Sequence, residues 1–436
     1  MKQERAAVRA FVSGCCGRQR IVLLWLFLWG IVGCSQPAVP HWLGGPSATP
    51  TATPVRITTE LSVWHWLGTP AEIAYQQQLL TTFQQQNPTV TVTLHTPDDY
   101  ARRLRTALGT DRPPDIIALN LFQLPDLVAA GALAPLSTAF LTEPDRYPHL
   151  RAAMQIDGTP YCLPLSFYTL GLFYNKQLFD NVGLAYPNDA WQWEDLQAAA
   201  EALTNGENGQ FGLVLSADFS RWLAFLYQAG GAVTTTDGRA MALNSPEATI
   251  ALDFYSNLVL EGKAAPPASL DSRWPGEAFA MERAAMAIEG NWLVPYLATE
   301  APDLTYGTAP LPAGPAGMAT LSFTTCLAVT AASPNQRAAE ELLAYLGSPE
   351  AMAGWLPITN ALPALRSVEV AWRTTYTDQS IFADQVTAAR EWQLPAGFQP
   401  WLADRNDELR RIFGGFIPAN ALLPAAENEG NELLQP

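Results

Sequence analysis

The side chains best suited to chemistry in this sequence are aromatic residues that lie next to short polar ones. The chain has 14 tryptophans and 13 tyrosines, and many of them are flanked by Asn, Ser, Asp or Gln. Flat aromatic rings stack on the weakly apolar C–H faces of sugar rings, while short polar side chains match the surrounding hydroxyls. This combination favours the reversible binding of a polyhydroxy ligand.

The first strand-like segment ends in such an aromatic pair. Leu61–Trp66 alternates with a period of two, and Trp66 falls where the edge of an α/β sheet would open on a binding crevice. Trp64 points to the same face as Trp66, so we expect one of the two in the core. His65 points the other way and is expected to be structural.

Motifs for catalysis and metal binding are missing from the sequence. It contains no GxSxG, no HExxH and no phosphate-binding loop, and it has only four histidines. A glycoside hydrolase would need two carboxyl groups facing each other across the scissile bond, and Asp218 with Glu289 is the only pair that could be nominated. We therefore expect a binding protein rather than an enzyme, with no cofactor and no metal.

The N-terminus resembles a lipoprotein signal. A basic start precedes an apolar run, Ile21–Gly33, which is too short to cross a bilayer comfortably and which leads directly into Cys34. We expect residues 1–33 to be a signal peptide and Cys34 to carry the lipid, so that the exported protein is anchored to the outer face of the cell membrane. The alternative is an ordinary signal peptide with an incidental cysteine.

The segment after Cys34 and the overall charge exclude some functions. Residues 34–59 are rich in Pro, Ser and Thr and are expected to form an extended tether. The chain carries a formal charge of -16, and no basic stripe appears after residue 34. A surface of this kind repels phosphate backbones, so no nucleic acid partner is expected.

After processing, Cys162 and Cys326 would be the only free cysteines. Exported chains meet oxidising conditions, so a disulfide between these two is one interpretation. Two separate buried thiols are the other, and the spacing of the cysteines does not decide between them.

The remaining sequence predicts an α/β protein with more than one core. A chain of 436 residues exceeds the size at which a single core keeps growing, so two lobes are expected. The strand at Leu61–Trp66 is followed by a helix ending at Asn87-Pro88 and by an alternating strand at Val90–Leu94. Proline one residue after serine predicts helix starts at Ser245, Ser333 and Ser348. A later helix places one apolar face along Trp193, Leu196, Ala200 and Leu203.

Taken in order, these segments resemble the extracellular solute-binding proteins of sugar importers, the family that includes maltose-binding protein. The resemblance covers roughly Leu61 to Leu434. The most specific stretch is DGTPYCLPLSFYTLGLFYNKQLFDNVGL, and the others that follow the family order are FQQQNPTVTVTL, PPDIIALN, AAGALAPL, WEDLQAAAEAL, QAGGAV, AAMAIEGNW and FTTCLAVTAASPNQRAAEELLAYLGSPEAM.

The resemblance implies a two-lobed, periplasmic-binding-protein-like α/β fold of type II with hinge crossovers. The N-terminal lobe would comprise residues 60–165 plus 323–363, and the C-terminal lobe residues 166–322 plus 364–436. The chain would cross between the lobes near Pro164–Ser166, near Thr324–Cys326 and near Pro363. On that map Cys162 and Cys326 both lie beside the hinge, which favours the disulfide.

The resemblance also implies which residues line the ligand cleft. Trp292 corresponds to a stacking tryptophan, with a core role as the alternative. Asp218 and Ser220 align with a ligand-contacting segment and Trp222 would stack nearby, although Asp218 could instead cap a helix. The further candidates are Asn120 and Gln123 on the loop after the third strand, Tyr168 beside the first crossing, and, ranked lower because a core or surface role suits them equally, Trp274, Asn291 and Trp401.

The function implied is that of the substrate-binding component of an ATP-driven importer, which binds a small carbohydrate, a mono- or oligosaccharide, between its lobes. Its expected partners are this ligand and the permease subunits of the importer. We expect a monomer whose only contact with the membrane is the lipid anchor. The alternatives are a binding protein for a polyol or a glycerol-phosphate-type solute, and a surface glycoside hydrolase.

Overall fold

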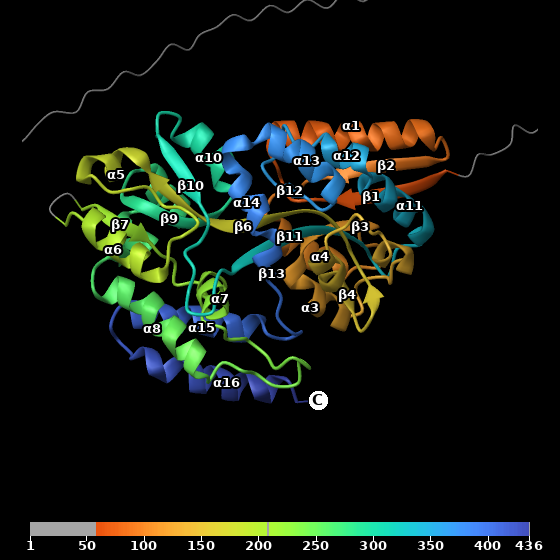
Figure 1. Ribbon diagram of the computed structural model, residues 1–436. Helices are drawn as coiled ribbons and strands as arrows, with labels where there is room; N and C mark the ends of the chain where they lie inside the picture. The colour runs from red at the N-terminus through yellow and green to blue at the C-terminus, as the bar shows by residue number, and fades with distance from the viewer. Residues whose placement is uncertain (1–57, 207–208, 436) are drawn as a thin grey trace, which may run out of the picture. The chain divides into compact units, whose positions relative to one another are not determined.

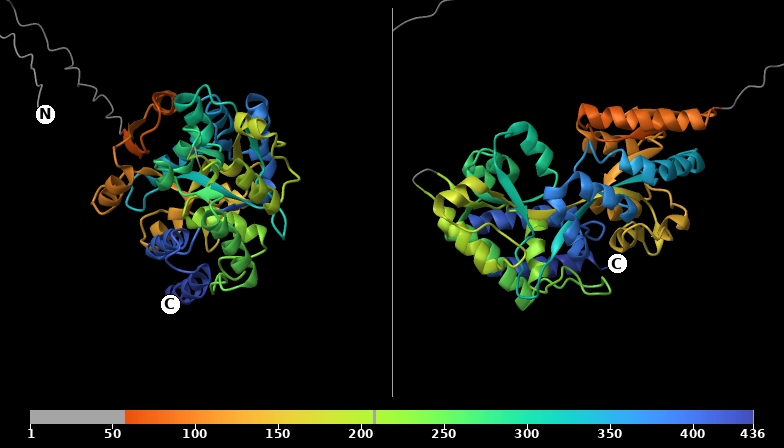
Figure 2. Two further views of the ribbon diagram at one scale, coloured as in Figure 1. Left: turned by 90° about the vertical axis from the view of Figure 1, so that its left-hand side faces the viewer. Right: turned by 45° about the horizontal axis from the view of Figure 1, so that its top comes forward.

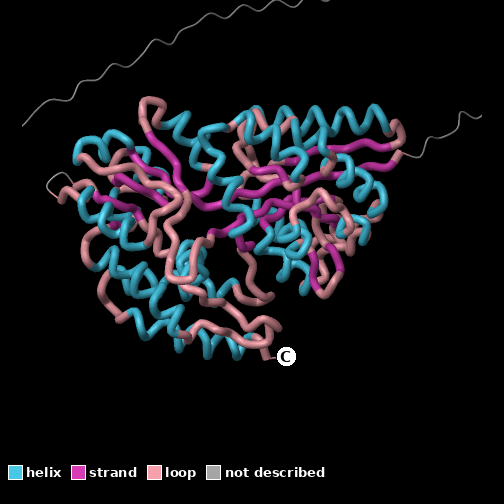
Figure 3. Tube along the Cα trace, in the orientation of Figure 1, coloured by secondary structure: helices cyan, strands magenta, loops and turns pink. Residues whose placement is uncertain are grey.

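A mixed β-sheet runs through the part of the chain that is described, residues 58–206 and 209–435 of a computed structural model. These residues belong to one unit, Arg56–Pro436. The strands lie between layers of helices (Figures 1 and 3). The main path of the sheet is β2-β1-β3-β11-β6-β9-β7-β8, with β10 and β12 paired to β6 and β13 paired to β11.

The first third of the described chain forms one end of this sheet and the helices beside it. Its elements are β1 (Thr59–Trp64), α1 (Pro70–Gln86), β2 (Val90–His95), α2 (Tyr100–Leu108), β3 (Ile116–Asn120), the short 3-10 helix η1 (Leu121–Gln123), α3 (Leu124–Ala129), α4 (Pro148–Ala153), β4 (Gln155–Ile156) and β5 (Thr159–Pro160). Strand β1 pairs in parallel with β2 and β3. The expected strand–helix–strand unit is therefore present.

Two long strands connect this end of the sheet to the other. These strands are β6 (Leu163–Asn175) and β11 (Thr320–Val329). The elements between them are α5 (Lys176–Val182), α6 (Trp193–Leu203), β7 (Phe211–Val214), α7 (Phe219–Gln228), α8 (Pro246–Leu260), β8 (Ala264–Ala265), α9 (Pro275–Ala280), β9 (Ala284–Gly290), α10 (Leu293–Glu300) and β10 (Tyr306–Ala309). The first part of β6 pairs with β11 and its second part with β9 and β10. Strand β11 in turn pairs with β3, so β6 and β11 carry the chain across the middle of the sheet.

The last third of the chain returns to both ends. Its elements are α11 (Gln336–Leu346), α12 (Pro349–Ala353), β12 (Leu362–Pro363), α13 (Arg366–Thr375), α14 (Ser380–Asp384), β13 (Ala389–Glu391), α15 (Gln399–Phe413) and α16 (Leu422–Leu433). Helices α7, α8, α15 and α16 pack together on the side of the sheet away from α1 (Figures 1 and 2).

Buried side chains form separate cores on the two sides of these central strands. One core contains Leu61, Phe83 and Cys326, and helices α1 and α11 pack against it. The other side holds two cores, around Trp222 and around Phe173. A two-lobed arrangement follows from these separate cores. The exact lobe boundaries stay a prediction. Several residues that were expected in the N-terminal lobe belong to the core around Phe173, namely Tyr147, Leu150, Met352, Leu356 and Leu362.

Several local expectations agree with the structure. Helix α1 ends at Gln86 with Asn87 as its C-cap, as expected from Asn87-Pro88, and Val92 is buried between exposed threonines in β2. The predicted caps Ser245 and Ser348 both accept a backbone hydrogen bond at the start of their helices.

One helix start is corrected. Helix α11 begins at Gln336, after the cap residue Asn335, and not at Ser333-Pro334. The hydroxyl of Ser333 donates to the carboxylate of Asp115, the residue before β3, and accepts from the backbone N–H of Asn335 at 3.2 Å, so this serine orders the loop ahead of the helix.

Cys162 and Cys326 are joined in a disulfide. Cys162 precedes β6 and Cys326 lies in β11, and these strands are neighbours in the sheet.

Among the described residues no helix is long and apolar enough to span a membrane. The predicted signal peptide, Cys34 and nearly all of the tether lie outside the described residues.

Candidate functional site

A cavity of about 350 Å³ lies where the two ends of the sheet meet. Its walls come from the segment after β1, the end of β3, η1, the middle of β6, the start of α10, the middle of β11 and the residue after β13. The lining residues are Trp66, Asn120, Leu121, Phe122, Tyr168, Trp292, Phe323, Thr324, Thr325 and Trp392. No charged side chain is among them, so the cavity offers aromatic faces, one amide and hydroxyls.

The aromatic rings of this cavity are arranged edge to face. The ring of Tyr168 lies 5.5 Å from that of Trp292 at 69°, and Phe323 lies 5.4 Å from Trp292 at 89°. In an edge-to-face pair, the ring that presents its edge keeps both of its faces uncovered by the other ring. Trp66 adds a fourth ring from the other end of the sheet, where it meets Tyr100 edge to face.

A buried ion pair fixes the orientation of Trp292. The indole Nε1 donates to Glu289 Oε2 at 2.9 Å, and Arg221 Nη2 donates to the same oxygen at 3.1 Å. The Arg221 guanidinium lies 5.4 Å from the centre of the Trp292 ring and 5.2 Å from that of Phe323. Glu289 is fully buried, so its interaction with Arg221 and Trp292 holds the indole against the cavity wall.

Burial and charge act in opposite directions on this pair. Burial lowers the pKa of the Arg221 guanidinium, but Glu289, Asp218 and Tyr255 together raise it by more, so the net shift is upward and Arg221 stays charged. Burial raises the pKa of Glu289, and Arg221 limits that rise.

A second, smaller compartment of about 80 Å³ adjoins the first. The two share Trp66, Tyr168 and Thr325, and the second adds His65, Glu72, Gln76 and Trp355 among others. Burial lowers the pKa of His65 to about 4, so this imidazole is neutral near pH 7 and donates from Nδ1 to the Trp66 carbonyl. His65 therefore helps to fix the backbone at Trp66, as expected for a structural histidine.

Four of the residues predicted from the sequence meet at the larger cavity, namely Trp66, Asn120, Tyr168 and Trp292. Gln123 lies beside it and accepts a hydrogen bond from the backbone N–H of Asn120, so its side chain holds the loop in place. Trp64 and Trp66 are both half-buried, and neither is enclosed in the core as one of them was expected to be.

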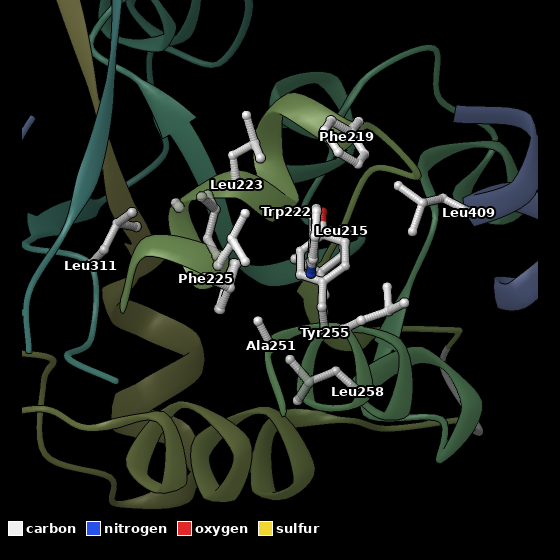
Figure 4. Close-up of a cluster of buried hydrophobic side chains, with 14 of the residues drawn as sticks. Leu215, Phe219, Trp222, Leu223, Phe225, Ala251, Tyr255, Leu258, Leu311 and Leu409 are labelled. Atoms are coloured by element: carbon white, nitrogen blue, oxygen red, sulfur yellow. The ribbon is translucent and has the colours of Figure 1, made fainter. Parts of the chain in front are cut away.

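The structure does not bring Trp222 and Trp401 to the cavity. Trp222 is fully buried in the core between α7 and α8, close to Phe219 and Tyr255 (Figure 4). Trp401 is 3% exposed and its indole donates to the Ala426 carbonyl, which secures α15 to α16. Both rings fill space between helices, and this corrects the expectation that they stack on a ligand.

Asp218 and Ser220 serve the start of α7. Asp218 Oδ1 accepts from the backbone N–H of Ser220 at 2.9 Å and from its hydroxyl at 2.8 Å. The capping interpretation of Asp218 therefore describes its contacts, and neither side chain lines the cavity.

Asn291 and Trp274 also have structural surroundings. Asn291 is fully buried, its Oδ1 accepts from the Thr169 backbone at 3.2 Å, and its amide donates to the Asn360 carbonyl. Trp274 packs edge to face on Tyr296, with ring centres 4.9 Å apart, outside the cavity.

Sequence reasoning missed several residues at the site. Trp392 has the same signal as the others, an aromatic ring between Glu391 and Gln393, and could have been found by it. Phe323 lies in a strand that reads as core, and Arg221 gives no signal because its role depends on the position of Glu289, 68 residues later.

The described residues contain no group of three or more His, Cys, Asp or Glu side chains that could hold a metal ion. What the arrangement offers is a cavity for an uncharged ligand, closed by aromatic rings from both ends of the sheet.

Residues 68–353 match the sequence model of the bacterial extracellular solute-binding proteins. The chain belongs to this family. Membership means that this solute-binding protein is exported, and family members bind solutes rather than transform them.

Known relatives cover most of the chain. The multiple sugar-binding protein of Streptococcus mutans is 22% identical over 312 residues, which is 67% of this chain and 72% of that protein. An ABC substrate-binding protein of Listeria monocytogenes, solved in complex with cycloalternan, superimposes with a TM-score of 0.77 at 23% identity and covers 86% of this chain and 99% of that one. The cyclic α-maltosyl-1,6-maltose binding protein of Arthrobacter globiformis gives a TM-score of 0.74 at 26% identity, with 86% and 99% covered.

Proposed function

We propose that this solute-binding protein captures a small, uncharged carbohydrate in the cavity lined by Trp66, Tyr168, Trp292 and Trp392 and delivers it to the permease subunits of an ABC importer. The observation that carries the proposal is the composition of the cavity wall. Aromatic faces stack on sugar rings, and the amide of Asn120 and the hydroxyls of Thr324 and Thr325 match sugar hydroxyls. The carbohydrates bound by the S. mutans, L. monocytogenes and A. globiformis relatives support the same ligand class.

The charge of the wall disfavours a phosphorylated solute. A phosphate ester calls for Arg or Lys side chains that point at the ligand. None lines the cavity, and the Nη2 group of Arg221, the cation nearest to Trp292 in the contacts described, is already bonded to Glu289. A neutral polyol remains the second candidate, because it shares the hydroxyls of a sugar although it lacks a ring to stack.

A hydrolytic function is poorly supported. Asp218 caps α7 and Glu289 is paired with Arg221 and Trp292, so neither carboxyl faces the cavity. Hydrolysis requires two carboxyl groups on opposite sides of the scissile bond.

A thermal-shift screen tests the proposed function. A ligand that binds only the folded state raises the melting temperature by mass action. Neutral mono- and oligosaccharides are expected to raise it, whereas sugar phosphates are not, and a polyol panel separates the second candidate. A screen in which only phosphorylated compounds shift the transition would contradict the proposal. Incubation with the best oligosaccharide should release no new reducing ends.

We further propose that Cys34 carries a lipid that anchors a monomeric protein outside the cell. The apolar run ending at Gly33 and the family's export support this. The full-length protein is expected in the membrane fraction and C34A in the soluble exported fraction. Equal partitioning of both would contradict the anchor.

A further inference from the structure

A buried carboxyl group lies directly behind the wall of the ligand cavity. Glu391 is the last residue of β13, and its side chain is 8% exposed. Its Oε1 accepts a hydrogen bond from the hydroxyl of Thr324 at 2.9 Å, and His149 Nε2 lies 3.5 Å from the same oxygen. Its Oε2 is buried and has no hydrogen-bond partner within the described chain.

Both neighbours of this carboxyl group reach the cavity. Thr324 in β11 and Trp392, the residue after Glu391, line it. Glu391 pairs with Ser322 in the sheet, and the Trp392 N–H donates to the Ser322 carbonyl at 3.0 Å. Glu391 is therefore connected to the ligand site through one hydrogen bond and one peptide unit.

The groups that face Glu391 leave its charge uncompensated. Helix α4 contributes His149, and β11 contributes the hydroxyls of Ser322 and Thr324. The other cation of α4, Arg151, donates to the Glu143 carbonyl at 3.2 Å. On the strand of Glu391 itself, Arg390 lies 4.4 Å from the centre of the Tyr227 ring.

Burial without a cation favours the neutral form of this carboxyl group. Burial raises the pKa of Glu391 to about 7, and the Ser322 and Thr324 hydroxyls limit the rise. Burial lowers the pKa of His149 to about 4. Glu391 therefore changes charge near neutral pH while His149 stays neutral.

We propose that Glu391 is a positioning residue that makes ligand binding proton-dependent, because it sets whether the Thr324 hydroxyl accepts or donates a hydrogen bond in the cavity. The ionised carboxylate takes the hydrogen of that hydroxyl, so the Thr324 oxygen is left as an acceptor. The protonated acid donates to the oxygen instead, so the hydroxyl hydrogen turns toward the ligand or toward Ser322 Oγ, which lies 3.4 Å from the Thr324 oxygen. This inference rests on the proposed carbohydrate function and names a regulation of the same site.

The ionised form is expected to bind the ligand more tightly. A hydroxyl that donates to a carboxylate becomes a stronger acceptor, and a sugar hydroxyl can donate to it in one connected chain. The affinity for the sugar should rise about fivefold between about pH 6 and about pH 8, because one hydrogen bond strengthened by a neighbouring charge changes affinity by about this factor.

Calorimetric titration tests the inference with the tightest-binding neutral sugar from the thermal-shift screen. The wild type should show the fivefold change and should release protons on binding near pH 7, as seen by comparing buffers with different heats of ionisation. E391Q keeps the shape and an acceptor for Thr324 but cannot ionise, so its affinity should be the same at both pH values. The exposed E341Q variant is the matched control and should behave like the wild type.

The remaining outcomes separate the competing explanations. H149Q should retain the pH dependence of the affinity. If H149Q instead loses this dependence while E391Q keeps it, the titrating group is the imidazole of His149 and the inference is overturned. If the wild type binds the sugar tightly and its affinity does not change with pH, the inference about Glu391 is overturned but the proposed function is not. Failure of every sugar to bind at any pH would contradict the proposed function as well.

Discussion

At the scale of single residues, tryptophans of similar sequence context have opposite roles. Trp222 and Trp292 both lie next to polar residues, yet the first is enclosed in the core and the second lines the cavity. Helix α7 is buried on nearly all of its surface, so there is no contrast between an exposed and a buried face that would separate Trp222 from a ligand-facing residue. Only the packing of α7 against α8 and α15 decides it.

The two tryptophans should respond differently to truncation. W292A is expected to weaken sugar binding roughly tenfold or more, because a stacking face is lost, and to cost about 1–3 kcal/mol of stability, because the buried Glu289 carboxylate loses a hydrogen-bond donor. W222A should lower the free energy of unfolding by about 3–5 kcal/mol, because it leaves a cavity in the core. Calorimetric titration and urea unfolding measure the two quantities. A large stability loss in W292A with unchanged affinity would identify Trp292 as a core residue.

Glu391 should also make the stability of the unliganded protein depend on pH. Its pKa is about 7 in the folded protein against an ordinary value of 4.5, so the folded state holds the proton more tightly. The stabilisation is fully present below about pH 4.5 and is lost as the pH rises through about 7. E391Q should therefore match the wild type near pH 4.5 and exceed its unfolding free energy by roughly 2–3 kcal/mol at about pH 8. Urea unfolding at both pH values checks this, and a variant less stable than the wild type at high pH would contradict it.

At the scale of elements, the start of α10 is held by contacts from two other segments. Asn291 accepts from Thr169 in β6 and donates to Asn360, which in turn donates to the Asn291 carbonyl at 2.9 Å. These bonds fix the residue directly before Trp292. The sequence could place Asn291 beside the stacking residue but could not tell that its amide faces away from the ligand.

N291A separates these two roles. Alanine leaves the Thr169 N–H and the Asn360 carbonyl buried without this partner, so the free energy of unfolding should fall by about 2–4 kcal/mol. A side chain that only contacted ligand would lower affinity and leave stability unchanged. Urea unfolding without ligand decides between the two, with N335A as a control because Asn335 Nδ2 donates to the Glu60 carbonyl at an exposed position.

At the scale of the whole molecule, a strongly negative chain encloses an uncharged cavity. The formal charge is -16, yet no charged side chain lines the cavity of about 350 Å³. Long-range attraction or repulsion of the solute should therefore contribute little to its affinity.

The affinity for a neutral sugar should consequently be insensitive to ionic strength. Salt at about 0.1 M screens interactions between charges that lie more than about 10 Å apart, and a neutral ligand carries no net charge to screen. The dissociation constant should change by less than about twofold between low and high salt in a calorimetric titration at constant pH. A larger change would mean that a charged group contacts the ligand.

The family, the α/β class and much of the local structure could be predicted from the sequence. Apolar periodicity, proline, and capping side chains are local signals, so the β1–α1–β2 unit, α6 and two of three predicted serine caps followed from them. The tertiary structure alone decided which aromatic residues meet. Trp66, Tyr168, Trp292 and Trp392 are far apart in the chain, and their convergence depends on β6 and β11 crossing the sheet. Whether a tryptophan faces a core or a cavity depends on what packs against its other side, and that information lies in distant segments.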